Sequence, residues 1–532
     1  MLVLRGPGGA RPDLTRHRYD ARVSATSLTA TRAPLYVGLD VGTTSTKGAI
    51  VDATGHILAE ASVPYPVSRP RPGWVEQDPH DYVDASIRVI RELLASPGFD
   101  ASCVAALCGS GQAPTHLLLD AHGEPVRPAI LWQDTRASAE ADALAHEVPA
   151  DAMASIIGMN WPVDASNPLA RGRWLATYEP ESLARAAHVL IPKDYVHYAL
   201  TGVMRTDPWS AKGLVHQGTH RVVEGIEALG GLPARIIPPA GTPRDVVGHV
   251  TAEASRRTGL PRGIPVTCGW TDGMVAMLGS GSLGHPGLAG DVSGTSEVTG
   301  VTVAGEPDVV GRLMAARVVD TDNWILYGPT QASGASLGWA MRTLMLPGDP
   351  VKPEARQAMA LALAATVAPG ADGLVFLPYL EGERAPIWNP RARGAFTGLS
   401  TTTEAGHLIR AVLEGVACSV RHILGLAEAN GGTPIREVRV AGGGARVALW
   451  NQIKADVTGY VFRPCETSEN GVLGSAILAA TGAGHFTDLA SASDAMVRLG
   501  DPVPPDLAHR DTYDALFRRY VALYPAIDLA TR

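Results

Sequence analysis

The sequence has few cysteines, no long apolar run and no P-loop motif, and each absence excludes a class of protein. Its five cysteines contain no CxxC pair and are odd in number, which is typical of a reducing compartment rather than of a disulfide framework. No run of 18 or more apolar residues occurs, so we expect no membrane span and a cytoplasmic protein. The motif GxxxxGK followed by Ser or Thr is also absent, which excludes a P-loop nucleotide site.

The charge balance argues against a nucleic-acid partner. A formal net charge of −8 offers no strong positive field to a phosphate backbone, so a small-molecule enzyme fits better. The 532 residues are too many for one hydrophobic core, which predicts two large domains.

Residues 1–34 differ from the rest of the chain. They hold six arginines against two aspartates, with several Gly, Pro, Ser and Thr residues, and they lack the apolar core of a secretory signal. We expect a disordered extension or a start codon assigned too early, with a targeting segment as the alternative.

The segment 35–51 predicts two strands joined by a tight turn. The first strand ends at Asp40, and Gly42, Thr43 and Thr44 follow it directly. Backbone N–H groups and hydroxyls in such a turn can bind anionic oxygens, and Asp40 is placed to hold Mg²⁺. A plain hairpin with a capping aspartate is the alternative.

The second half of the chain contains two further candidate ligand loops. Gly294, Thr295 and Ser296 form a similar turn before the apolar run 298–303, and two facing turns can hold a polyphosphate from both sides. An ordinary hairpin turn is the alternative. Gly442, Gly443 and Gly444 follow a predicted strand and precede a predicted helix over 450–457, which favours close approach of a ligand over a flexible loop.

Asp272 follows the apolar strand 266–268 and begins a predicted helix over 272–278. A carboxylate there can cap the helix, or it can accept a proton from a substrate hydroxyl beside a nucleotide. Residues 279–284 match GxGxxG, but we reject a dinucleotide site because a helix precedes them and His285, Pro286 and Gly287 follow. This turn marks the expected boundary between a first domain, 35–287, and a second, 288–532.

Apolar-turn-apolar units recur in both halves of the chain, at 50–55, 116–123 and 316–326, which predicts two related α/β domains. Apolar residues spaced three and four apart predict helices over 81–94, 135–146 and 405–430.

Together these motifs resemble the FGGY family of carbohydrate kinases from about residue 35 onward. The matching segments lie in the family's order along the chain. They are 40–43, 132–136, 192–195, 294–296, 382–386, 394–399 with 407–414, and 441–444.

The resemblance implies an α/β fold of two ribonuclease H-like domains, of the actin-like ATPase and sugar kinase type, around a central cleft. It implies a kinase that uses ATP and Mg²⁺, with Asp272 as catalytic base. Phosphate and Mg²⁺ contacts are expected from Asp40, Gly42, Thr43 and Thr44, with Asp40 as metal ligand. The other nucleotide contacts are expected from Gly294, Thr295, Ser296, Gly442, Gly443 and Gly444.

The sugar is expected against the first domain. Its contacts are assigned to Gln112, Ala113, Pro114, Trp132, Asp134 and Asp272. Within the family the likeness is strongest to the xylulokinases, through 72–79 and 190–195, which favours D-xylulose or a related ketopentose as acceptor. No assembly is specified, and a homodimer is left open.

The loop 112–115 departs from that pattern. Where xylulokinases place Met-His-Gly after a glutamine, this chain has Ala113, Pro114 and Thr115, and the lost histidine removes one hydrogen bond to a sugar. The Arg-Glu pair of glycerol kinases is absent as well. Arg171 replaces a lysine, and Trp270 stands where a glycine is common. Kinases of ribulose, erythritol or gluconate therefore stay open, as does a non-kinase ATPase or sugar-binding relative.

Overall fold

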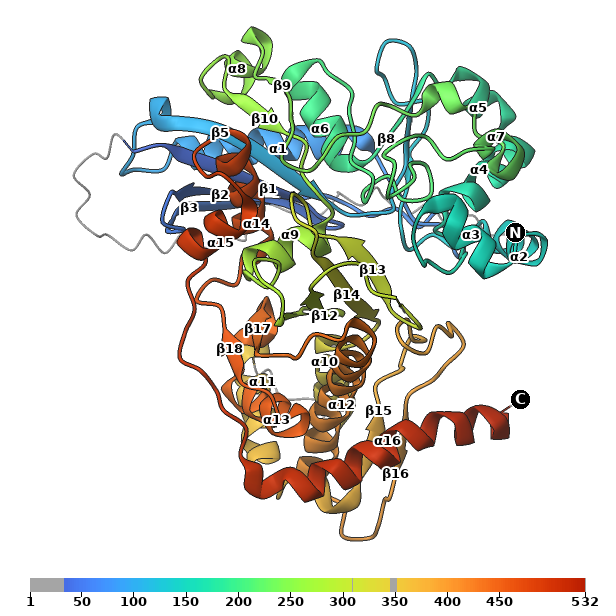
Figure 1. The fold of residues 1–532 in the computed structure, drawn as a ribbon, viewed down its shortest axis with the longest axis vertical. Coiled ribbons are helices and arrows are strands. Elements are labelled where there is room, and N and C mark those ends of the chain that lie inside the picture. Colours follow the sequence, from blue (N-terminus) through green and yellow to red (C-terminus); the bar gives the residue numbers. More distant parts are fainter. Residues whose placement is uncertain (1–32, 309, 345–351, 532) are drawn as a thin grey trace, which may run out of the picture.

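The computed structural model describes residues 33–308, 310–344 and 352–531. The chain forms two lobes, which lie one above the other in Figure 1. The predicted extension 1–34 lies outside the described residues, apart from positions 33 and 34.

The first lobe is built on a six-stranded sheet in the order β3-β2-β1-β5-β10-β9. Strand β1 pairs antiparallel with β2 and parallel with β5, and β5 pairs parallel with β10. The strands are β1 Leu35–Val41, β2 Ser45–Asp52, β3 Ile57–Pro64, β5 Val104–Gly111, β9 Val246–His249 and β10 Pro265–Thr267.

The second lobe repeats this arrangement in a sheet of order β13-β14-β12-β11-β17-β18. Strand β11 pairs antiparallel with β12 and parallel with β17, as β1 does with β2 and β5. The prediction of two related α/β domains is therefore confirmed. The strands are β11 Leu288–Ser293, β12 Glu297–Val303, β13 Met314–Arg317, β14 Trp324–Thr330, β17 Glu437–Ala441 and β18 Phe462–Pro464.

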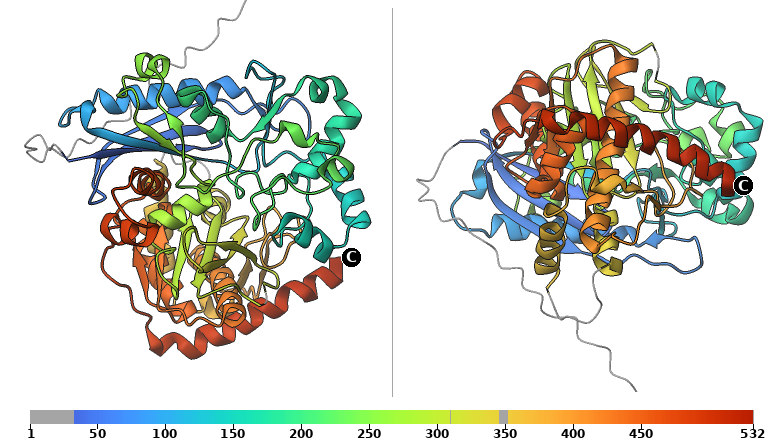
Figure 2. Two further views of the ribbon diagram at one scale, coloured as in Figure 1. Left: turned by 45° about the horizontal axis from the view of Figure 1, so that its top comes forward. Right: turned by 90° about the horizontal axis from the view of Figure 1, so that it is seen from below.

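Helices cover both sheets, and smaller strand pairs lie beside them. In the first lobe the other elements are β4 Glu76–Gln77, α1 Pro79–Leu94, β6 Leu117–Leu119, β7 Ala129–Ile130, α2 Ser138–Glu147, α3 Ala150–Ile157, α4 Pro168–Tyr178, α5 Pro180–Arg185, β8 His188–Leu190, α6 Pro192–Thr201, α7 Ile226–Gly230 and α8 Ala252–Thr258. In the second lobe they are α10 Gly334–Leu344, α11 Pro353–Ala365, β15 Val375–Leu377, β16 Ala395–Thr397, α12 Ala405–Gly431, α13 Ala448–Thr458, α15 Leu489–Met496 and α16 Arg510–Thr531. Helix α16 runs along the second lobe, as both views of Figure 2 show.

The predicted helices over 81–94, 272–278, 405–430 and 450–457 are confirmed. Helix α2 starts three residues later than predicted, at Ser138. The residues before it are held in a loop, because the Thr135 N–H donates to Gly73 O at 2.8 Å.

Two helices join the lobes. Helix α9, Asp272–Gly279, packs against α14, Asn470–Gly482, and α14 in turn lies against β1 and β5 of the first sheet. The approach is so close that a Cβ built at Gly474 would lie 1.9 Å from Val275 O, so only glycine fits there. The late segment of the chain thus completes the core of the first lobe.

Within the described part of the chain, no helix is long and apolar enough to cross a membrane.

Candidate functional site

The first predicted turn lies between β1 and β2, and side chains from other elements hold its backbone. The Tyr65 hydroxyl donates to Gly42 O at 2.6 Å, and Gln77 Nε2 donates to Thr43 O at 2.7 Å. Thr44 is exposed. The turn is therefore rigid on its inner side and open on its outer side.

Gln112 is buried and supports this turn. Its Oε1 accepts from the hydroxyls of Thr43 at 3.1 Å and Thr115 at 3.3 Å. Its Nε2 donates to Gly42 O at 3.2 Å and to Gln77 Oε1 at 3.1 Å. Both polar atoms of Gln112 are therefore engaged within the protein, which makes it a support for the turn.

Trp132 extends this network, because its Nε1 donates to Thr43 Oγ1 at 3.1 Å. Its ring is half-buried. Ala113 is half-buried and directly precedes the buried Pro114. The peptide bond between these two residues is cis. Trp132 and Ala113 remain partly accessible next to the turn.

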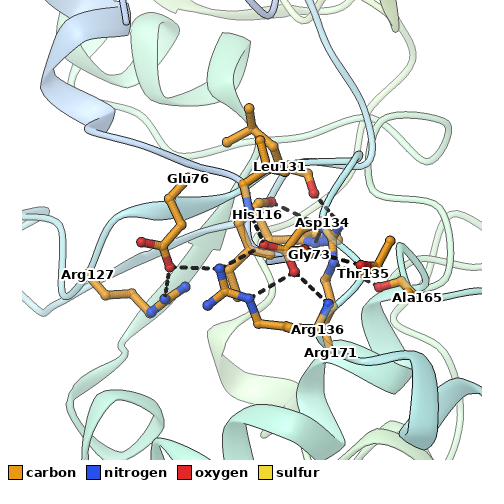
Figure 3. A network of polar contacts seen from close by, with 12 residues as sticks. Gly73, Glu76, His116, Arg127, Leu131, Asp134, Thr135, Arg136, Ala165 and Arg171 are labelled. Atoms are coloured by element: carbon orange, nitrogen blue, oxygen red, sulfur yellow. Dashed lines mark hydrogen bonds and ion pairs between the residues drawn. The ribbon is translucent and has the colours of Figure 1, made fainter. Parts of the chain in front are cut away.

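Asp134 lies in the buried polar network of Figure 3. Its Oδ2 accepts from Val75 N at 2.6 Å and from Arg136 Nη2 at 2.7 Å, while its Oδ1 accepts from Arg136 Nε at 2.9 Å. The Arg136 guanidinium in turn lies 3.7 Å from the centre of the Trp74 ring. Asp134 is thus fully occupied in fixing the loop that carries Trp132.

Asp40 ends the first strand beside the start of α14. Its Oδ1 accepts from Ser110 Oγ at 2.8 Å, whereas its Oδ2 has no hydrogen bond among the described residues. A Cβ built on Gly471 would lie 3.4 Å from that Oδ2, so the glycine leaves the space beside it open. Desolvation raises the pKa of Asp40, and the nearby Lys47 partly offsets this.

This donor set fits a magnesium ion held jointly with a nucleotide. Mg²⁺ takes oxygen ligands and is usually bound by one or two carboxylates together with water and phosphate oxygens. Over residues 33–308, 310–344 and 352–531, no group of three or more His, Cys, Asp or Glu side chains could hold a metal by itself. Asp40 therefore fits as the protein's contribution to a shared site.

Asp272 is the first residue of α9, and its Oδ1 accepts from Gly273 N at 2.8 Å. Its side chain is exposed to solvent, yet desolvation by the surrounding protein, followed by the charge of Asp40, raises its pKa to about 6. Lys212 and Arg384 partly offset the rise in pKa, so two cations lie near this carboxylate.

The second predicted turn joins β11 to β12, in the same position as the first turn in its sheet. Gly294 N donates to Ser296 O at 2.8 Å, and the start of α10 closes the turn, because Gly334 N donates to Gly294 O at 3.0 Å. Gly294 and Thr295 are exposed. The exposed side of this turn is free to meet a ligand.

A buried charged triad lies beneath the second turn. Lys454 Nζ donates to Asp291 Oδ2 at 2.7 Å and to Glu297 Oε1 at 2.6 Å, and the Ser333 hydroxyl donates to the same glutamate oxygen at 3.2 Å. Desolvation and the nearby Glu297 raise the pKa of Asp291, and Lys454 partly offsets this. The triad fixes both strands at the point where the turn begins.

The three glycines lie directly against the second turn. Gly442 has a φ of 76°, and a Cβ there would lie 2.6 Å from Ser293 O. A Cβ on Gly444 would lie 2.5 Å from Ser293 Cβ, whereas Gly443 is exposed with open space around it. Gly442 N donates to Asn470 Oδ1 at the start of α14 at 3.2 Å, which links this loop to the residues beside Asp40.

The structure thus brings the predicted nucleotide residues together around the starts of α9 and α14. The charge of Asp40 acts on Asp272, Gly471 lies beside Asp40, and Asn470 contacts the glycine loop. Sequence reasoning missed Lys454 and Lys212. No local pattern marks them, because Lys454 lies 157 residues from its partner Glu297.

Comparison with known proteins gives a consistent result. Models of the FGGY family of carbohydrate kinases match over residues 35–279 (N-terminal domain) and 291–483 (C-terminal domain). A xylulose kinase of Bacillus subtilis (strain 168) is 29% identical, over 92% of this chain and 96% of its own length. A gluconokinase of the same organism is 26% identical, over 86% and 89%. The crystal structure of xylulose kinase from Rhodospirillum rubrum is 34% identical, with a TM-score of 0.82 over 93% of this chain and 99% of that one.

Proposed function

Because the chain belongs to the FGGY family of carbohydrate kinases, and so transfers phosphate from ATP to a carbohydrate, we propose that Asp272 is its general base. The observation that carries this assignment is an accessible carboxylate at the start of α9, on which the charge of Asp40 acts, with a pKa of about 6. A base with a pKa near neutral is suited to take a proton from a hydroxyl as it attacks phosphorus.

The two turns and the glycine loop would bind ATP. Thr44 and Thr295 are exposed, and their N–H groups and hydroxyls would bind phosphate oxygens from opposite lobes, while the open space at Gly443 would receive the adenosine. Asp40 would hold Mg²⁺, which when bound neutralises charge on the β- and γ-phosphates. Asp272 would orient the acceptor hydroxyl and receive its proton during in-line attack.

For the acceptor, the names of the relatives favour D-xylulose or a related ketopentose. Trp132 and Ala113 are the accessible members of the predicted sugar set, so we propose that they contact the sugar. Gln112 and Asp134 would act through the turn and loop that they hold. An aldonate is a second candidate, because one relative is a gluconokinase and an unpaired cation, Lys212, lies beside Asp272.

We also propose domain boundaries at 35–287 and 288–532, with α14 returning to the first lobe. A cytoplasmic location is supported by the odd number of cysteines and by the lack of a CxxC pair in the sequence.

The test is a coupled ADP-release assay with a panel of ketopentoses, ketohexoses, polyols and aldonates, each run with Mg²⁺ and again with excess EDTA. We expect at least one carbohydrate to raise ADP release well above the rate with water alone, and EDTA to abolish the increase. A carbohydrate-independent rate across the whole panel would contradict the proposal.

A further inference from the structure

The Lys212 side chain is surrounded by protein atoms, but no carboxylate forms an ion pair with it among the described residues. Its Nζ lies 4.8 Å from the centre of the Trp161 ring, and among the described residues no hydrogen bond or ion pair reaches that Nζ. The Nζ nevertheless stays accessible to solvent. Desolvation lowers the pKa of Lys212 to about 8, so the side chain still carries its charge at pH 7.

Two other closely surrounded lysines show how the fold normally treats such a charge. Lys193 Nζ lies 2.6 Å from Asp194 Oδ1 and 2.9 Å from Asp207 Oδ2. Lys454 has two carboxylates within 2.7 Å, as described above. Unlike these two, Lys212 has no carboxylate in ion-pair contact within the described part of the chain, which is costly unless a ligand supplies one.

Lys212 lies beside the proposed base. Its loop is fixed to the end of β10 by the Trp209 and Trp270 rings, whose centroids are 5.2 Å apart at 70°. Asp272 follows two residues after Trp270, and the charges of Lys212 and Asp272 act on each other.

A second cation reaches the same place from the other lobe. The charge of Arg384 acts on both Lys212 and Asp272. Its Nη2 donates to Thr330 O at 2.6 Å, while its Nε is buried and has no hydrogen-bond partner among the residues that the structure describes. Two cations from opposite lobes therefore act on one carboxylate.

Asp164 is the main anion that acts on Lys212. Among the described residues no ion pair joins it to the lysine, and its Oδ1 accepts from Ser166 N at 2.8 Å and from Ser166 Oγ at 2.6 Å. The net effect of the surroundings is still to disfavour the charged lysine. Asp164 therefore leaves the charge of Lys212 largely available to a ligand.

Building on the proposed kinase activity, we propose that Lys212 and Arg384 bind a carboxylate on the acceptor, and hence that the acceptor is an open-chain sugar acid, the second candidate above, rather than a neutral ketopentose. A carboxylate accepts strong charge-assisted hydrogen bonds from both ammonium and guanidinium groups. A hydroxyl elsewhere on the same chain would then face Asp272. A neutral sugar would leave Lys212 uncompensated, so Lys212 is a specificity residue.

The test compares matched acceptors that differ only in charge: D-gluconate with D-glucitol, and D-xylonate with xylitol, with D-xylulose as a neutral ketose. In the wild type we expect kcat/KM to be at least about tenfold higher for each acid than for its polyol. Lys212→Met should lower kcat/KM for the acids by about 10- to 100-fold, the usual effect of losing a hydrogen bond to a charged group, and leave neutral acceptors within about threefold.

Two control variants and one binding measurement complete the design. Lys212→Arg keeps the charge and should keep the preference for acids, and Lys352→Met removes an exposed lysine and should behave as wild type. D-gluconate should also raise the unfolding temperature of the wild type more than D-glucitol does. Equal kcat/KM for acids and polyols in the wild type would overturn the inference, and so would equal losses for both in Lys212→Met. In either case, phosphorylation of any carbohydrate would still support the proposed kinase function. If no carbohydrate stimulates ADP release, the proposed function fails, and this inference fails with it.

Discussion

Replacing Asp272 with asparagine removes the proposed base while keeping the size of the side chain at the start of α9. A pKa of about 6 means that about a tenth of Asp272 is ionised at pH 5 and about nine tenths at pH 7. In the wild type, kcat/KM in the ADP-release assay should therefore fall about tenfold from pH 7 to pH 5. Asp272→Asn should lower kcat by about two to four decades, and the remaining rate should lose this pH dependence.

Stability gives an independent readout for the same variant. Because the folded state raises the pKa of Asp272, the ionised carboxylate costs folding free energy above pH 6, and the cost disappears below about pH 4. The unfolding temperature of Asp272→Asn should thus equal or exceed that of the wild type at pH 7, with a smaller difference at pH 4. Asp488→Asn, at the N-cap of α15, is the matched control and should leave kcat unchanged. Near wild-type turnover of Asp272→Asn, or a flat wild-type profile between pH 5 and 7, would refute the reasoning.

Two further predictions concern the nucleotide side. Gly442→Ala should raise KM for ATP more than KM for the sugar. It should also lower the free energy of unfolding by about 1–3 kcal/mol, because the φ of Gly442 is 76° and the new Cβ would meet Ser293 O. Gly443→Ala, in open space, should change the free energy of unfolding in urea by no more than about 0.5 kcal/mol. Equal effects of the two alanines would contradict this. Lys454→Met should lower the free energy of unfolding by about 3–5 kcal/mol, because it leaves Asp291 and Glu297 buried together without a cation, and adding Asp291→Asn should recover part of the loss. An unchanged urea midpoint for Lys454→Met would show that the triad is not needed.

The parts of the site that could be predicted from sequence are those whose signal is local. The turns after Asp40 and before Glu297 each follow a strand directly, so strand and turn chemistry together place them. The rejection of 279–284 as a dinucleotide site is confirmed in the same way, since α9 precedes it and β11 follows. Lys212 and Lys454 could not be predicted, because their roles depend on which distant side chains the fold brings, or does not bring, within reach.

Gln112 and Asp134 show a second limit of sequence reasoning. Both lie in segments assigned to the sugar, yet their polar atoms are engaged by neighbours such as Thr43 and Arg136. A motif indicates which segment lies near a ligand. Which side chains of that segment face the ligand depends on packing, and here the fold turns the strongest hydrogen-bonding groups inward.

The return of α14 to the first sheet has a consequence for how the chain can be divided. Val472, Leu473 and Ala476 belong to the same buried cluster as Tyr36 of β1, so a fragment that stops near residue 287 would expose that apolar surface to water. The halves are therefore not autonomous modules that could be exchanged between relatives by a single crossover. A first-lobe fragment would have to bind the fragment that carries α14 to bury this surface, which makes this junction suited to a complementation reporter.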